Sequence, residues 1–267
     1  MTTTPTEPGG TRPPSMGGMA PGTWAGARMP IPGNAEFAVY FLIELIFALI
    51  WIVADSVDTR LAGIEVHGAR VRMGERLARE APADADLVLP IPDSGTPAAI
   101  GFSRALGLPF SEGLIKNRYV GRTFIEPDQG LREQGIRLKF NPLAEVKGKR
   151  VVAVDDSIVR GNTTRQIVQM LFDAGAAEVH VRVSAPPIIS QCYYGIDFPD
   201  PDELIASDKT VEEVREHLGA TSLAYLSLEG LQASTRRPAT QFCRACLTRD
   251  YPTAVPREAK KFQFESV

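Results

Sequence analysis

Two adjacent carboxylates, Asp155 and Asp156, follow a continuous apolar run over residues 151–154. Such a run is typical of a strand buried on both faces of a parallel sheet, so the carboxylates are expected at the strand's carboxyl end. A polar turn over residues 157–164 comes next, and a helical pattern then continues to Gly175. Ligands of open α/β sheets bind beyond the carboxyl ends of the strands, which makes this turn a candidate site.

The turn combines the features of an anion site with those of a diol or metal site. Backbone N–H groups at a helix N-terminus attract phosphate, and small or hydroxyl-bearing residues let them close on it. The turn supplies such residues as Ser157, Gly161, Thr163 and Thr164. The acidic pair suits ribose hydroxyls or a hard cation such as Mg²⁺. A phosphorylated ribose fits this combination, and a solvated acidic turn is the simpler alternative.

A second strand–turn–helix corner lies upstream. Apolar residues 87–92 predict a short strand, and an apolar helix is predicted over residues 97–106. The turn between them contains Asp93, Ser94 and Gly95. Small residues after a buried strand favour anion binding, although an ordinary turn is the alternative. Residues 115–142 then carry several lysine and arginine side chains, as a solvated loop or a lid over an anionic ligand would.

These candidate residues need a scaffold, which the apolar patterns predict. An amphipathic helix is expected over residues 64–79, a buried strand over 178–184, a helix over 208–218, and a strand leading into a helix over 222–231. The alternation of strands and helices indicates an α/β protein with a parallel sheet. The basic residues of the first helix are interpreted as a solvated face: Arg70, Arg72, Arg76 and Arg79.

The stretch VVAVDDSIVRGNTT resembles the phosphoribosyl-pyrophosphate (PRPP) signature of type I phosphoribosyltransferases. Three further stretches are similar to the amidophosphoribosyltransferases: LPIPDSGTPAAIGF, IKNRYVGRTFI and APPIISQCYYGIDFPDPDELIAS. The resemblance implies a type I phosphoribosyltransferase fold, an α/β fold with a mostly parallel twisted sheet flanked by helices and a flexible lid loop. It also implies transfer from PRPP to ammonia, which gives 5-phosphoribosylamine and pyrophosphate in the first step of de novo purine biosynthesis.

The same resemblance implies roles for individual residues. The substrate-binding set would be Asp93, Ser94, Gly95, Asp155, Asp156, Ser157, Arg160, Gly161, Asn162, Thr163 and Thr164. Within it, Mg²⁺ would be coordinated by Ser94, Asp155 and Asp156. The catalytic lid residues would be Lys116, Arg118 and Arg122, whose charges would offset the charge of the departing pyrophosphate.

The chain has three cysteines and no secretory signal, a pattern that favours a reducing, cytoplasmic compartment over a disulfide framework. Cys192, Cys243 and Cys246 match three of the four ligands of a [4Fe–4S] cluster in the iron–sulfur subclass of the resembled family. The fourth cysteine is missing from the sequence. The remaining candidates for that ligand, without positive support, are His67, His180 and His217.

Residues 1–33 are rich in proline and glycine and are expected to be disordered. Within the uncertain segment 34–62, the apolar run 37–54 is long enough to cross a membrane. Glu44 in its middle would cost about 2.5–3.5 kcal/mol there if charged. If the protein is soluble, this run is a buried strand or helix docked onto the transferase domain. A replaced or damaged segment of the resembled family is preferred over a membrane anchor.

The transferase domain is expected over residues 63–252, followed by a tail over 253–267. No cysteine precedes Cys192, so the glutaminase domain of the resembled family is expected to be absent. PRPP, ammonia, a separate glutaminase chain and further copies of this chain are the implied partners. A net charge of −3 gives no indication of a nucleic-acid partner. The alternatives are a non-catalytic PRPP or nucleotide-binding regulator and an inactive truncated homologue.

Overall fold

A four-stranded parallel sheet lies at the centre of the computed structural model, which describes residues 60–61, 64–117, 138–193 and 201–254. The strands run in the order β3-β6-β7-β8, with β3 over Leu87–Pro90, β6 over Arg150–Asp155, β7 over Glu178–Val183 and β8 over Ser222–Tyr225. All three strand pairings are parallel. The predicted α/β fold class and the predicted strands are therefore confirmed.

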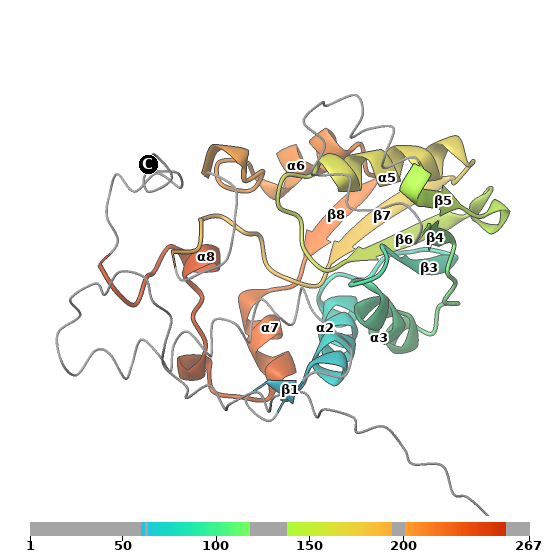
Figure 1. Cartoon of the computed structure of the whole chain (residues 1–267). Coiled ribbons are helices and arrows are strands. Elements are labelled where there is room, and N and C mark those ends of the chain that lie inside the picture. The colour runs from blue at the N-terminus through green and yellow to red at the C-terminus, as the bar shows by residue number, and fades with distance from the viewer. Residues whose placement is uncertain (1–59, 62–63, 118–137, 194–200, 255–267) are drawn as a thin grey trace, which may run out of the picture. The chain divides into compact units, whose positions relative to one another are not determined.

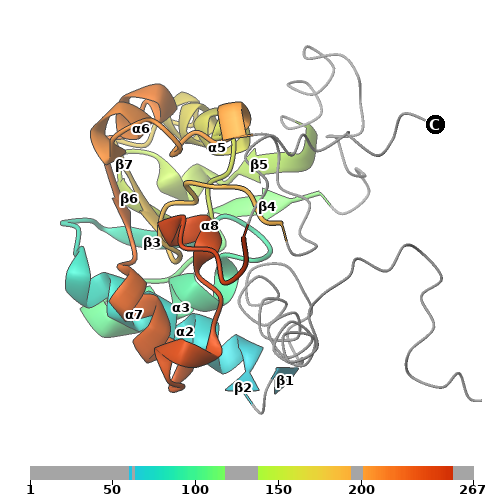
Figure 2. The ribbon, with the colours of Figure 1, turned by 90° about the vertical axis from the view of Figure 1, so that its left-hand side faces the viewer.

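Helices cover both faces of this sheet (Figures 1 and 2). One face carries α2 (Val66–Glu80), α3 (Thr96–Leu106) and α7 (Leu228–Thr235), and the other carries α5 (Asn162–Asp173) and α6 (Val211–Leu218). The smaller elements are β1 (Arg60–Leu61), β2 (Ile64–Glu65), the antiparallel pair β4 (Leu114–Lys116) and β5 (Phe140–Pro142), the 3-10 helices η2 (Ala144–Val146), η3 (Pro201–Glu203) and η4 (Ala239–Gln241), and α8 (Ala245–Thr248).

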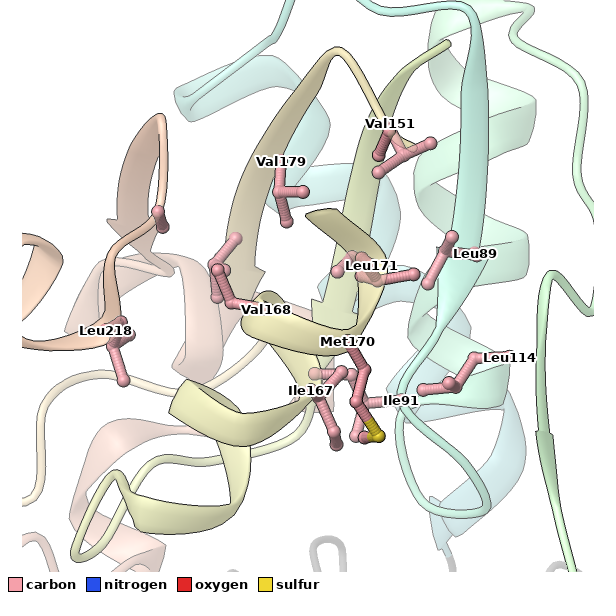
Figure 3. Close-up of a cluster of buried hydrophobic side chains, with 14 of the residues drawn as sticks. Leu89, Ile91, Leu114, Val151, Ile167, Val168, Met170, Leu171, Val179 and Leu218 are labelled. Carbon is pink, nitrogen blue, oxygen red and sulfur yellow. The ribbon is translucent and has the colours of Figure 1, made fainter. Parts of the chain in front are cut away.

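Both faces of β6 are buried, which explains its continuous apolar run. Val151 packs in the cluster beneath α5, whereas Val152 packs in the cluster that includes α2 and α3. Figure 3 shows the first cluster, in which Ile167 and Leu171 of α5 lie with Val179 of β7. Each such fully buried side chain contributes about 1.5–3 kcal/mol relative to exposure. This packing holds the start of α5 beside the carboxyl end of β6.

Two glycines allow α2 and α3 to touch backbone to backbone. A Cβ atom added at Gly74 would lie 1.8 Å from the carbonyl oxygen of Ala98, and one at Gly101 would lie 2.0 Å from that of Val71. Both distances are far inside van der Waals contact, and the atoms met belong to helical backbone that cannot turn aside. The close approach fixes α2 against the helix that follows β3.

The solvated face predicted for α2 is wrong for two of its arginines. Arg70 is only 5% exposed, and Arg72 donates its Nε hydrogen to the carbonyl oxygen of Ser234 at 2.7 Å. Arg76 and Arg79 are exposed as predicted. The reason is positional, because buried residues of α2 recur at helical spacing on one face and Arg70 lies within that face.

Several predictions concern residues outside the described part of the chain. They concern the segment 1–33, predicted to be disordered, the apolar run 37–54, the predicted lid residues Arg118 and Arg122, and most of the tail. Among the helices in the described ranges, none is both long enough and apolar enough to span a bilayer.

Replacing Gly74 with alanine should destabilise the fold. The added methyl group would force α2 and α3 apart, and overpacking of this kind costs about 1–3 kcal/mol. Gly68→Ala is the matched control in the same helix, since a Cβ there meets no backbone atom and lies 3.3 Å from the Arg72 side chain and 3.5 Å from that of Glu65. That control should stabilise the protein by about 0.5–1 kcal/mol, because alanine favours helix over glycine. Urea denaturation measures both, and equal effects of the two variants would contradict the packing account.

Candidate functional site

The two predicted carboxylates lie at the carboxyl end of β6 and are largely enclosed. Asp155 is 7% exposed and accepts hydrogen bonds from the backbone N–H of Asp156 at 2.9 Å and from the Thr164 hydroxyl of α5 at 3.3 Å. Asp156 accepts a hydrogen bond from the backbone N–H of Ser157 at 2.7 Å. The first turn of α5 and the end of β6 are thus joined through the acidic pair.

Burial raises the pKa of the Asp155 carboxyl well above its ordinary value, and the neighbouring Asp156 carboxylate raises it further. Burial also raises the pKa of Asp156, although hydrogen bonds from Asp155, Ser157 and Ser94 and the positive charge of Arg70 oppose this effect. Two adjacent carboxylates in so little water cannot both ionise without a further positive or donor group. The pair therefore depends on the donors and positive charge that surround it, and a ligand that brings more of either would favour its ionised form.

The turn after β3 lies beside the acidic pair. After β3 the backbone N–H of Ile91 donates to the carbonyl oxygen of Val154 at 2.8 Å, which ties the corner to β6. The Ser94 side chain hydrogen-bonds the Asp156 carboxylate, and Asp93 forms an ion pair with Lys116 of β4. Both predicted turns therefore meet at one edge of the sheet, with a lysine at the end of the described part of the lid.

Gly95 belongs to this corner because no other residue fits there. An added Cβ would lie 2.4 Å from the carbonyl oxygen of Val154 and 2.8 Å from that of Ile91. Its own N–H donates to the Ile91 carbonyl oxygen at 3.2 Å, and α3 begins at the next residue. The turn consequently brings the start of α3 close to the end of β6.

The turn before α5 packs against Ile205. Gly161 has a φ of +78°, a left-handed conformation that suits glycine, and an added Cβ would lie 2.7 Å from Ile205. The backbone N–H of Ile205 donates to the carbonyl oxygen of Val159 at 2.9 Å. Arg160, predicted to bind phosphate, is half-exposed and paired with Glu203. The segment after η3 therefore holds the turn in shape.

The first turn of α5 has the properties of an anion site. The helix has no side-chain cap at its N-terminus, where backbone N–H groups lack helical acceptors. Asn162 and Thr163 are exposed there, whereas Thr164 is buried against Asp155. An anion at this end of the helix would be favoured by the helix dipole as well as by the amides.

Two residues near the acidic pair escaped the sequence-based prediction. Arg70 of α2 acts on the pKa of Asp156, and the Asp155 charge acts on the pKa of Tyr225, the last residue of β8. The helical spacing of the apolar residues around Arg70 could have identified it as buried. No local pattern marks Tyr225, because its position depends on the pairing of distant strands.

The predicted iron–sulfur ligands do not form a metal site in this structure. Burial raises the pKa of the Cys246 thiol to about 12, with Cys192 and Cys243 contributing, so the three lie in one neighbourhood. Nevertheless, the described ranges contain no group of three or more histidine, cysteine, aspartate or glutamate side chains arranged to hold a metal. His180 instead lies 2.9 Å from the Ser222 hydroxyl through Nδ1. The iron–sulfur cluster therefore has no support from the described residues and stays a prediction from the resemblance.

Comparisons with known proteins give a consistent result. The family profile described as phosphoribosyl transferase domain matches residues 64–191. Amidophosphoribosyltransferase of Synechococcus elongatus is 50% identical over 240 residues, covering 90% of this chain and 46% of that protein. Amidophosphoribosyltransferase of Archaeoglobus fulgidus is 58% identical over 204 residues, covering 75% of this chain and 45% of that protein.

The solved structures agree with the sequences. Glutamine PRPP amidotransferase from B. subtilis, complexed with ADP and GMP, superposes with a TM-score of 0.73 at 50% identity, covering 80% of this chain and 48% of that one. The chain spans about half the length of the relatives it matches. The part that matches has the type I phosphoribosyltransferase fold.

The raised pKa of Asp155 predicts how stability depends on pH when no ligand or metal is present. Above the ordinary pKa of 3.8 the unfolded chain loses this proton while the folded chain keeps it, so stability falls as pH rises from there toward the raised pKa. Asp155→Asn removes the buried acid and should raise the free energy of unfolding at pH 7 by about 0.5–2 kcal/mol.

Thermal denaturation in EDTA over a pH series measures this effect. Asp173→Asn, at the exposed far end of α5, is the matched control and should change neither the stability nor its pH dependence. A ligand-free Asp155→Asn protein that is less stable than wild type at pH 7 would contradict the account.

Proposed function

Residues 64–191 form a phosphoribosyl transferase domain related to that of the amidophosphoribosyltransferases, and from this premise we propose that the chain transfers the phosphoribosyl group of PRPP to ammonia. The products are 5-phosphoribosylamine and pyrophosphate. The observation that carries the proposal is the meeting of two strand–turn–helix corners at one buried acidic pair. This arrangement matches a substrate with a phosphate at one end, a diol in the middle and a pyrophosphate at the other end.

Each part of the substrate has a counterpart in the described residues. The 5-phosphate would accept hydrogen bonds from the backbone at the start of α5 and from the exposed Thr163. The ribose hydroxyls would donate to Asp155 and Asp156, where burial favours additional donors. The pyrophosphate would lie over the corner that contains Ser94, within reach of Lys116.

Mg²⁺ suits the oxygen ligands of this site. The ion binds proteins through one or two carboxylates together with substrate phosphates, so the lack of a three-carboxylate group in the described ranges does not conflict with it. Asp155, Asp156 and Ser94 would hold it, and it would supply positive charge to the pyrophosphate as the C1–O bond breaks. The protein's own task is to position the sugar and exclude water.

The chemical step needs little acid–base help. Ammonia donates its lone pair to C1 of the ribose, the C1–O bond breaks, and pyrophosphate leaves with the electron pair; the attached nitrogen then loses a proton to solvent. Positive charge develops on the ribose ring during this exchange, and the two carboxylates beneath it stabilise that charge. Lys116, released from Asp93, would offset the growing charge on pyrophosphate. Positioning and electrostatics therefore carry the rate enhancement.

The proposed nitrogen donor is ammonia, which is already nucleophilic and needs no general base. Arg118 and Arg122, proposed as lid residues, lie outside the described ranges. A separate glutaminase chain, homo-oligomer formation and a cytoplasmic location stay predictions, and the reaction as proposed includes no iron–sulfur cluster.

The test is titration of the full chain with Mg·PRPP, followed by measurement of ammonia-dependent pyrophosphate release. Wild type should bind Mg·PRPP and release pyrophosphate at high ammonium and alkaline pH. The Asp155→Asn/Asp156→Asn double variant should lose about 100-fold or more of the release rate, as expected when charges that stabilise a transition state are removed. Asp173→Asn serves as the control and should keep wild-type activity.

The possible outcomes separate the competing functions. Binding of Mg·PRPP without any pyrophosphate release would identify a regulator instead of an enzyme. Failure of the wild-type chain to bind would identify an inactive homologue. Unchanged activity in the double variant would show that the acidic pair is not the sugar site.

A further inference from the structure

Tyr225 lies in line with the acidic pair across the carboxyl edge of the sheet. Asp155 of β6 is paired in register with Val183 of β7, and Val183 is paired with Tyr225 of β8. Residues in register on neighbouring parallel strands project to the same face. The contacts agree, since Asp155 meets Thr164 of α5 while the Tyr225 ring packs against the apolar cluster beneath α5. Both side chains therefore lie on the face of the sheet that α5 covers.

The hydroxyl group of Tyr225 has no structural partner. Its oxygen is buried, and no hydrogen-bond partner for it occurs in the part of the chain that the structure describes. A buried hydroxyl without a partner destabilises a protein, and a phenylalanine would fill the same apolar space without that penalty. The ring alone explains the packing. The hydroxyl calls for another explanation.

The Asp155 carboxylate can accept more hydrogen bonds than the protein donates to it. Besides its side-chain hydrogen bond with Asp156, it accepts from one backbone N–H and from one hydroxyl, and the latter bond is long at 3.3 Å. The carboxylate is close enough to Tyr225 for its charge to raise the pKa of the phenol, after burial as the larger cause. Tyr225 therefore keeps its proton and can serve as a hydrogen-bond donor at neutral pH.

A sugar hydroxyl would satisfy both groups at once. It has one hydrogen to donate and two lone pairs that accept, so it can donate to a carboxylate while accepting from a phenol. We propose that Tyr225 is a ribose-binding residue whose hydroxyl donates a hydrogen bond to the sugar hydroxyl that Asp155 accepts. This inference rests on the proposed function, because the ligand is the ribose 5-phosphate part of PRPP, and it adds a binding contact from β8.

Tyr225→Phe tests the contact, since it removes the hydroxyl and keeps the ring. Titration of the full chain with ribose 5-phosphate should show an affinity about fivefold to tenfold weaker than that of wild type, the usual effect of one lost hydrogen bond. The affinity for magnesium pyrophosphate should stay within about twofold, because pyrophosphate would lie over the β3 corner and away from β8. The melting temperature of the ligand-free variant should be unchanged or higher.

Tyr251→Phe is the matched control. The Tyr251 hydroxyl is bonded to Ser190 and to the carbonyl oxygen of Gln191, far along the chain from β8, and its removal should leave ribose 5-phosphate affinity unchanged. It should lower the melting temperature, since a made hydrogen bond is lost. The two variants thus differ in both measurements: only Tyr225→Phe should weaken ribose 5-phosphate binding, and only Tyr251→Phe should lower the melting temperature.

The results that overturn the inference are distinct from those that overturn the proposed function. Equal affinity of wild type and Tyr225→Phe for ribose 5-phosphate would refute the role of Tyr225 alone. A lower melting temperature of ligand-free Tyr225→Phe would also refute it, since the hydroxyl would then have a partner within the protein. If wild type binds neither ribose 5-phosphate nor Mg·PRPP, the proposed function fails and this inference fails with it.

Discussion

The burial of two adjacent carboxylates at the end of β6 is the constraint on which the site depends. Asp155 and Asp156 lie where water cannot solvate both charges, so the protein must supply donors and positive charge from several directions. Ser94, Thr164 and Arg70 supply them from three different helices or their leading turns. These groups do not cancel the effect of burial, since the pKa values of both carboxyls stay raised, and a ligand with hydroxyl groups or a cation would stabilise the ionised pair further. The folding free energy that the ligand-free protein loses by burying this pair can thus be regained when a ligand binds.

The order of the strands brings the turns of the candidate site together around the acidic pair. Because β6 lies between β3 and β7, the turn after β3 and the turn after β6 leave the sheet at the same edge. The backbone contact between Ile91 and Val154 holds the two turns together, while β8 brings Tyr225 to the opposite side of the pair. The close approach of α2 to α3 through Gly74 and Gly101 keeps Arg70 buried. Packing far from the ligand therefore determines the geometry of the charges.

Local patterns allowed part of this arrangement to be predicted from sequence. The run that ends at Asp155 identified the strand, and the small and hydroxyl residues up to Thr164 identified the anion-binding turn, because each depends on neighbours in the chain. Arg70 was assigned to solvent because its charge outweighed its place on the buried stripe of α2. Tyr225 could not be found, since its relation to Asp155 passes through the register of three strands. The cysteine spacing suggested a cluster that the three-dimensional arrangement does not support.

The most direct test of the central claim is a crystal structure of this protein with ribose 5-phosphate. The account predicts a phosphate within hydrogen-bond distance of the backbone amides of residues 162–164, with the ribose hydroxyls on Asp155 and Asp156. A sugar phosphate bound away from the acidic pair, or a pair that stays hydrogen-bonded only to the protein when the ligand is present, would contradict it.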